Sequence, residues 1–190
     1  CFVAEKYMLH GANKGYPEFV ETMRKLVASR PDLPFRFHVV GSCTAADWNT
    51  AGLESGLQFH GRLNTPDLRH FYRQMDMVIS PNKPFLLHQG NFDGFPTGCC
   101  VEASLCGVCM VATDMLGLNP AYTDNRDMIV IEPDPENIAN RVLTMIDEGK
   151  LSNIARSGQQ LTRSLFSPAM QLQSRMQIIR YHAKQSGVNL

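Results

Sequence analysis

The sequence lacks net charge, because 18 Lys and Arg residues balance 18 Asp and Glu residues along 190 positions. A chain without a basic excess has no electrostatic footprint for nucleic acid or for an anionic membrane surface. It also lacks any apolar run of the length that a membrane-spanning helix needs. We therefore expect a globular protein that binds no nucleic acid and has no transmembrane segment.

Cysteine is sparse as well, with six residues in the chain. This number is too small for a disulfide-stapled scaffold of this length. Cys106 and Cys109 form a C-x-x-C pair, which is typical of redox proteins and of half zinc sites. No second such pair and no spaced His pair completes a zinc site. We expect buried free thiols in a reducing cytoplasm and no metal site.

The sequence does contain a regular alternation of apolar runs and helical patterns. Apolar runs predict strands at residues 2–4, 35–40, 57–60, 77–80, 108–112 and 128–131. Helical patterns between most of them predict an α/β fold, a Rossmann-like parallel sheet in three layers with helices on both faces. The length suits a single domain, residues 1–190. The opening apolar run, Cys1 to Ala4, predicts that this domain is a fragment of a longer chain.

One stretch, Asn91 to Asp114, combines a turn, a helix and a strand. Its Asn, Asp, Gly and Pro residues predict a turn at 91–96. Pro96 suits the first position of a helix that runs from Thr97 to Leu105. A strand follows the helix. In a parallel α/β sheet, the loop before such a helix lies at the carboxyl edge of the sheet, where ligands bind. We therefore expect the N-terminus of this helix at the ligand-binding edge.

This loop-to-helix junction has a chemical consequence. The first N–H groups of a helix have no intrahelical partner and carry the positive end of the helix dipole. Gly94, Thr97 and Gly98 are small enough to let a diphosphate approach them. Asp93 and Glu102 bracket the junction, and their carboxylates suit sugar hydroxyls better than phosphate. A sugar nucleotide fits this pattern, although an ordinary turn before a core helix fits the spacing equally well.

The residues DGFPTGCCVEASLCGVCMVATD, positions 93–114, resemble a sequence block of GT-B glycosyltransferases. The block has an acidic-Gly-Phe-Pro segment, Glu-Ala, Cys-Gly and Val-Ala-Thr-Asp, and it belongs to the retaining family called glycosyl transferases group 1. Two features depart from it. The first acid is Asp93 where the family has Glu, and eight residues instead of seven separate it from Glu102. We interpret this as one extra residue near Thr97 and Gly98.

The resemblance also implies roles for residues outside this block. Lys14 and Gly15 match a pair that clamps the donor diphosphate, and Lys6 stands where the family usually has an arginine. The segment 61–63 matches one whose backbone faces the nucleotide base. The implied catalytic residues are Lys14, Asp93 and Glu102, and the implied donor-binding residues are Lys6, Gly15, Gly41, Gly61, Arg62, Leu63, Gly94, Phe95, Pro96, Thr97 and Gly98.

As a member of this family, the chain would be the donor-binding half of a GT-B fold. The resemblance implies transfer of a sugar, with retention, from a nucleoside-diphosphate sugar to an acceptor hydroxyl, without a cofactor. In the family the acceptor site lies on an N-terminal domain. That domain is absent here, so we expect the fragment alone to be inactive. We expect a cytoplasmic location, with peripheral membrane association of the full-length protein as a further option.

Three rival functions remain open. The first is a sugar-nucleotide-binding domain without catalysis. Two departures from the family pattern favour it: the extra residue before Glu102, and a lysine, Lys6, where the family usually has an arginine. Another GT-B enzyme, such as a sugar-nucleotide epimerase, would need no separate acceptor. A redox protein would use Cys106 and Cys109.

Overall fold

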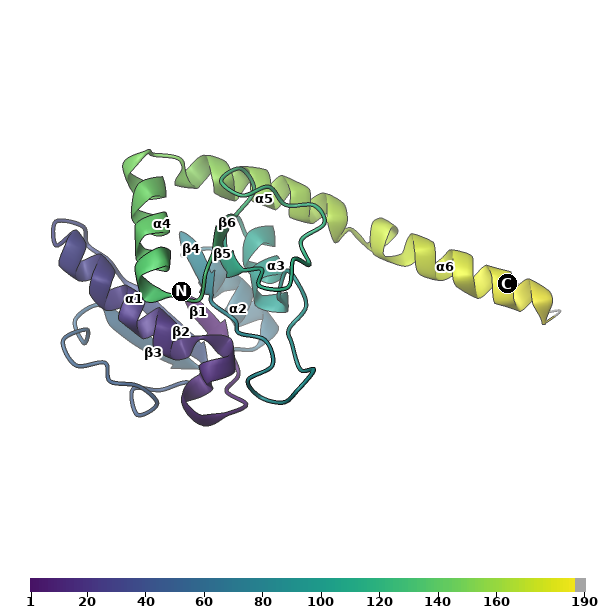
Figure 1. Ribbon diagram of the computed structural model, residues 1–190. Helices are drawn as coiled ribbons and strands as arrows, with labels where there is room; N and C mark the ends of the chain where they lie inside the picture. Colours follow the sequence, from purple (N-terminus) through teal and green to yellow (C-terminus); the bar gives the residue numbers. More distant parts are fainter. Residues whose placement is uncertain (187–190) are drawn as a thin grey trace.

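The computed structural model describes residues 1–186 and has parallel β-structure at its centre (Figure 1). The strands are β1 (Phe2–Ala4), β2 (Phe37–Gly41), β3 (Leu57–Gly61), β4 (Met77–Ser80), β5 (Cys109–Thr113) and β6 (Ile129–Ile131). They form two parallel three-stranded sheets, in the orders β1-β2-β3 and β4-β5-β6. Cys1 N donates to Met77 O at 2.6 Å and Ile79 N donates to Cys1 O at 2.8 Å, which joins the sheets edge to edge. The combined order, β3-β2-β1-β4-β5-β6, is that of a Rossmann fold.

Helices cover both faces, so the predicted three-layer α/β fold is confirmed (Figure 1). The first face carries α1 (Tyr16–Ser29) and α4 (Pro135–Asp147), which pack together. The second face carries α2 (Thr65–Tyr72) and α3 (Gly98–Leu105), and α5 (Leu151–Leu165) packs against α3 and β5. A short 3-10 helix, η1 (Leu9–Lys14), precedes α1, and α6 (Pro168–Gln185) follows α5.

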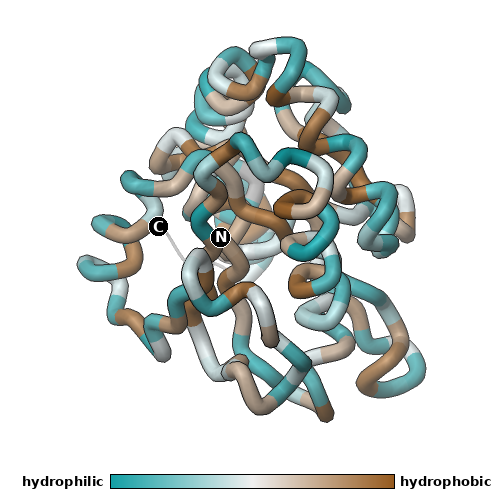
Figure 2. Tube along the Cα trace, turned by 90° about the vertical axis from the view of Figure 1, so that its left-hand side faces the viewer, coloured by the Kyte–Doolittle hydropathy of each residue, from teal (hydrophilic) through white to brown (hydrophobic). Residues whose placement is uncertain are grey.

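Helix α4 shows how the sequence directs this packing. The Asp134 side chain accepts a hydrogen bond from Asn137 N at 2.8 Å and so caps the first turn, which also contains Pro135. Ile138 and Val142 recur on one helix face and are fully buried in the same cluster as α1. Burial of each such side chain contributes about 1.5–3 kcal/mol to stability. Figure 2 shows the same principle, with apolar residues along the central strands and polar residues on outer helix surfaces.

The carboxyl edge of the sheet contains a switch point between β1 and β4, where the strand order changes direction. Ligand crevices of open α/β sheets lie at such points. The loops after these two strands meet there, because Lys83 N donates to Asn13 O at 2.9 Å. Gly15 permits the close approach, since its φ is +76° and a Cβ would stand 2.1 Å from Pro81 O. The N-terminus of α1 therefore lies directly against the end of β4.

The helix predicted at 97–105 begins one residue later in the structure, and the position predicted for Pro96 is wrong. Pro96 does not occupy the first helical position, because Thr97 is extended, with φ −66° and ψ 157°, and the helix begins at Gly98. Thr97 Oγ1 lies 3.3 Å from Ser80 Oγ, which ties this residue to the end of β4. The contact holds Thr97 in the non-helical conformation of an N-cap residue.

Helix α6 extends away from the layered body (Figure 1). Its exposed apolar side chains include Met170, Ile178 and Tyr181. Within residues 1–186, no helix combines the length and the apolarity that crossing a lipid bilayer demands.

Candidate functional site

The switch point brings together a lysine and an aspartate that are far apart in the sequence. Lys14, at the end of η1, donates from Nζ to both carboxylate oxygens of Asp93 at 2.7 Å. Asn82, two residues after β4, donates from Nδ2 to Asp93 Oδ2 at 2.8 Å. The Lys14 side chain is only 13% exposed, and it lies over the Tyr7 ring at 5.3 Å from the centroid. Two predicted catalytic residues therefore form one ion pair at the edge where ligands bind.

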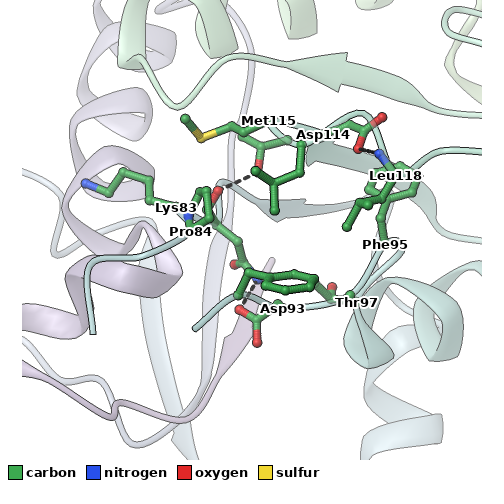
Figure 3. A pocket seen from close by; sticks show the side chains of 13 residues that line it. Lys83, Pro84, Asp93, Phe95, Thr97, Asp114, Met115 and Leu118 are labelled. Atoms are coloured by element: carbon green, nitrogen blue, oxygen red, sulfur yellow. Dashed lines mark hydrogen bonds between the residues drawn. The ribbon is translucent and has the colours of Figure 1, made fainter. Parts of the chain in front are cut away.

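Asp93 lines a small hollow between the loop after β4 and the loop after β5 (Figure 3). Thr113 Oγ1, at the end of β5, donates to Asn82 O at 2.6 Å and ties the two loops together. On the far side the Asp114 carboxylate accepts a hydrogen bond from Leu118 N at 2.7 Å, which fixes the second loop. The hollow measures about 40 Å³. This is room for about three water molecules, so a hexose enters only if the loops separate.

The N-terminus of α3 opens toward this hollow. Thr97 lines it, and a Cβ added to Gly94 or Gly98 would meet nothing within 4 Å. Within residues 1–186, the N–H groups of Gly98, Cys99 and Cys100 have no hydrogen-bond partner. Three donors at the positive end of a helix dipole make a seat for an anion.

Glu102 lies in a second hollow, which borders the middle and the C-terminal end of α3. This groove between α2 and α3 measures about 270 Å³ and is lined by Thr65, Leu68, Arg69, Tyr72, Glu102, Leu105 and Cys106. The Glu102 side chain is exposed and has no hydrogen-bond partner in the described part of the chain. The Tyr72 hydroxyl is buried and also unpaired within residues 1–186. The two predicted carboxylates therefore line different hollows, Asp93 before the start of α3 and Glu102 in its second turn.

Two adjacent cysteines form part of the same helix turn. Cys99 Sγ lies 3.2 Å from Thr97 Oγ1 and 4.0 Å from Ser80 Oγ. Hydrogen bonds from Cys100, Thr97 and Ser80 lower the pKa of the Cys99 thiol, although burial opposes the shift. The helix N-terminus acts in the same direction. Cys99 was covered only by the general expectation of buried free thiols, and its position at a loop-to-helix junction was the signal for reactivity.

The expectation of buried free thiols holds in part. All six cysteines are free, but Cys1, Cys99 and Cys106 are half-buried, and only the other three are buried. Burial raises the pKa of the Cys109 thiol to about 12, so little thiolate forms there at neutral pH. The C-x-x-C pair is therefore poorly suited to thiol exchange.

The other predicted cations are tied up elsewhere. Lys6 Nζ binds Asp47 Oδ1 at 2.5 Å, and no contact joins it to the Lys14–Asp93 pair within residues 1–186. Arg62 forms a two-pronged ion pair with Glu5, at 3.0 and 2.9 Å. Hydrogen bonds from Arg62 hold the pKa of the Glu5 carboxyl below its usual value. These pairs lie after β1 and β3, next to the switch point but outside the hollow that Asp93 lines.

The remaining predicted donor-binding residues differ in how much free space surrounds them. A Cβ at Gly41 would stand 1.9 Å from Ala4 O, so this glycine serves the pairing of β1 with β2. Gly61 has nothing within 4 Å of such a Cβ and is open. Leu63 and Phe95 pack against the core, the latter with its ring centroid 6.5 Å from that of Tyr122.

Comparison with known proteins decides the family. The family model described as glycosyl transferases group 1 matches residues 3–148, well over half of the chain. The chain belongs to the glycosyl transferases group 1 family. The resemblance inferred from positions 93–114 is thereby confirmed at the level of the family and of a glycosyltransferase domain.

Curated relatives support this group 1 assignment. The D-inositol 3-phosphate glycosyltransferase of Paenarthrobacter aurescens (strain TC1) is 29% identical over 126 residues, which are 63% of this chain and 29% of the relative. The protein of the same name from Arthrobacter sp. (strain FB24) is 26% identical over 126 residues, 63% of this chain and 28% of the relative. The chain thus spans less than a third of the length of the curated relatives it matches.

Solved structures that include glycosyltransferases share the fold. The C-terminal domain of a glycosyl transferase group 1 family protein (LpcC) from Francisella tularensis has a TM-score of 0.67 and 22% identity, over 86% of this chain and 83% of that one. A glycosyltransferase from Rickettsia africae has a TM-score of 0.73 and 17% identity, over 95% and 46%. Anabaena Alr3699/HepE, in complex with UDP and glucose, has a TM-score of 0.69 and 18% identity, over 94% and 47%. The predicted Rossmann-like half of a GT-B fold is confirmed.

Proposed function

We propose that this chain is the donor-binding domain of a retaining glycosyltransferase that uses a nucleoside-diphosphate sugar. The observation that carries the proposal is the position of α3 between two hollows. Its N-terminal N–H groups are unpaired within the described residues, while Asp93 lies in one hollow and Glu102 in the other. A diphosphate with a hydroxylated ring at each end matches this arrangement. In this assignment Glu102 binds the ribose hydroxyls and Asp93 binds the transferred sugar.

The proposed chemistry is stabilisation of a leaving diphosphate. Negative charge develops on this group as the bond to the sugar breaks, and donors already oriented toward it lower the barrier. Lys14 is the cation beside the site, and the N–H groups of Gly98 and Cys99 are the dipolar donors. The backbone at Phe95 and Pro96 borders the sugar side. The acceptor site and part of the catalytic machinery are proposed to reside in the remainder of the full-length protein.

A second candidate is a sugar-nucleotide-binding domain without catalysis. The eight-residue spacing between Asp93 and Glu102 and the closed Lys14–Asp93 pair favour it. Both candidates bind a sugar nucleotide, so binding does not separate them. Turnover of a sugar nucleotide by the full-length protein with its acceptor does, because the second candidate predicts none.

Calorimetric titration with UDP, GDP and ADP tests donor binding. We expect one of the three to bind, and Glu102→Gln and Lys14→Met each to weaken it by 10- to 100-fold. A hydrogen bond to a charged group contributes about 1.5–3 kcal/mol, which corresponds to this range. Glu148→Gln is the matched control, because this exposed glutamate follows the last turn of α4. Binding that survives both site substitutions at full strength would place the nucleotide elsewhere.

A further inference from the structure

The Asp93 carboxylate has two partners of different kinds. Both of its oxygens accept hydrogen bonds from the Lys14 ammonium at 2.7 Å. Oxygen Oδ2 also accepts one from the Asn82 amide at 2.8 Å. The carboxylate is 35% exposed, and the lysine that holds it is 13% exposed. Asp93, which lines the small hollow (Figure 3), is therefore held by a cation and by a neutral amide.

A bound diphosphate removes the first of these partners. The proposed function assigns Lys14 to the diphosphate, and an ammonium that faces a carboxylate with its donors cannot hold a phosphate equally well. The hollow of about 40 Å³ also has to widen before a hexose fits. Separation of Lys14 from Asp93 frees the ammonium for the diphosphate. It leaves Asp93 with Asn82 as its remaining side-chain partner within residues 1–186.

Asn82 is well anchored for this task. Its main-chain oxygen accepts a hydrogen bond from Thr113 Oγ1 at 2.6 Å, which ties it to the end of β5. Its side-chain oxygen accepts one from Ser80 Oγ at 3.3 Å, which ties it to the end of β4. The amide group that contacts Asp93 is thus fixed by two central strands and carries no charge that a phosphate would attract or repel.

We propose that Asn82 is a positioning residue, which holds the Asp93 carboxylate toward the sugar once the donor diphosphate has taken Lys14. This inference rests on the proposed function and adds a residue to it. It implies that the two partners of Asp93 have opposite effects on ligand preference. The Lys14–Asp93 pair opposes binding of a nucleoside diphosphate that lacks a sugar. The Asn82–Asp93 bond favours the sugar-bearing donor, because it presents a fixed acceptor to the sugar hydroxyls.

The test compares the affinity for UDP with the affinity for UDP-glucose, and likewise GDP with GDP-mannose and ADP with ADP-glucose, by calorimetry. Asp93→Asn frees Lys14, so we expect it to tighten the diphosphate about threefold or more and to abolish the preference for the sugar-bearing form. Asn82→Ala is expected to leave the diphosphate affinity within about twofold and to lower the preference for the sugar nucleotide about tenfold. Asn91→Ala, an exposed asparagine of the same loop, is expected to change neither.

A second variant, Asn82→Asp, separates loss of the Asn82–Asp93 contact from misfolding of the chain. It keeps the size of the side chain and the main-chain bond to Thr113, but it places a second carboxylate beside Asp93. We expect a larger loss of preference than with Asn82→Ala, with an unchanged thermal unfolding midpoint. An unchanged preference in both Asn82 variants, or an equal loss for both ligands, would overturn this inference alone. Absence of nucleotide binding by the native chain would overturn the proposed function and this inference together.

Discussion

Three cations at the carboxyl edge of the sheet each form an ion pair with a carboxylate. Lys14 contacts Asp93, Lys6 contacts Asp47 and Arg62 contacts Glu5. Each cation among the predicted donor-binding and catalytic residues is thus already matched by a carboxylate from another loop. A ligand anion must compete with these carboxylates, and the competition is weakest where solvent screens the pair, as at Arg62 with its 77% exposed side chain.

Cys99 provides a prediction that depends on pH. Its lowered pKa places more thiolate at neutral pH than an ordinary cysteine has, so iodoacetamide should modify it fastest. We expect the rate to approach its plateau at a lower pH than that of a model thiol. A bound nucleoside diphosphate should slow the reaction, because it covers the first turn of α3. Mass spectrometry of alkylated peptides measures both effects.

The control for this reaction is Cys106, which is half-buried at the opposite end of α3. Cys106→Ser should leave the fast reaction intact, whereas Cys99→Ser should remove it. A fast reaction that persists in Cys99→Ser would show that another thiol is the reactive one.

Single residues also show how far sequence reasoning extends at this site. Lys14 and Asp93 were singled out by family resemblance, and their contact needed the folded chain because 79 positions separate them. Asn82 was missed, since an asparagine after a strand is typical of any turn. Its position two residues after β4, at the edge where such sheets bind ligands, was the available signal.

The packing of helix α1 against the end of β4 depends on a close backbone contact, and a glycine occupies the contact position. Gly15 has φ +76°, and a Cβ there would clash with Pro81 O at 2.1 Å. We expect Gly15→Ala to lower the free energy of unfolding by about 2–4 kcal/mol, from backbone strain and overpacking together. It should also weaken nucleotide binding, because the displaced turn carries Lys14. Denaturant unfolding and calorimetry provide the two measurements.

Gly52→Ala is the matched control for this substitution. Gly52 has φ +83°, but an added Cβ would meet nothing within 4 Å. It should therefore cost only the strain, about 1–2 kcal/mol. Equal losses in the two variants would mean that the approach of α1 to β4 contributes nothing to stability.

The presence of the helices was easier to predict than the position of one helix boundary, the start of α3, which matters most for function. Periodic apolar residues and the Asp134 cap are local signals, and they are sufficient to specify α4. The start of α3 was misplaced at Pro96, since the rule that favours proline in the first turn competes with a tertiary contact. The bond between Thr97 and Ser80 comes from a strand 17 positions away, which no local pattern encodes.

The whole molecule is organised by the reversal of strand order between β1 and β4. The alternation of strands and helices predicted parallel layers, but it did not specify which strands are neighbours. The order β3-β2-β1-β4-β5-β6 brings the loops after β1, β4 and β5 together, and all three border the α3 N-terminus or the hollow beside it. The exposed apolar residues Phe85, Phe92, Met115 and Leu116 lie on the last two loops, around the same hollow.

The central claim is that one nucleoside-diphosphate sugar reaches both hollows, with its diphosphate at the first turn of α3. The most direct test is to record amide NMR shifts of the labelled chain during titration with UDP-glucose, GDP-mannose and ADP-glucose. The account predicts that one nucleotide shifts the amide signals of Gly98, Cys99 and Cys100 together with those near Lys14 and Thr65. Shifts confined to one hollow, shifts at the opposite edge of the sheet, or no shifts with any of the three would contradict it.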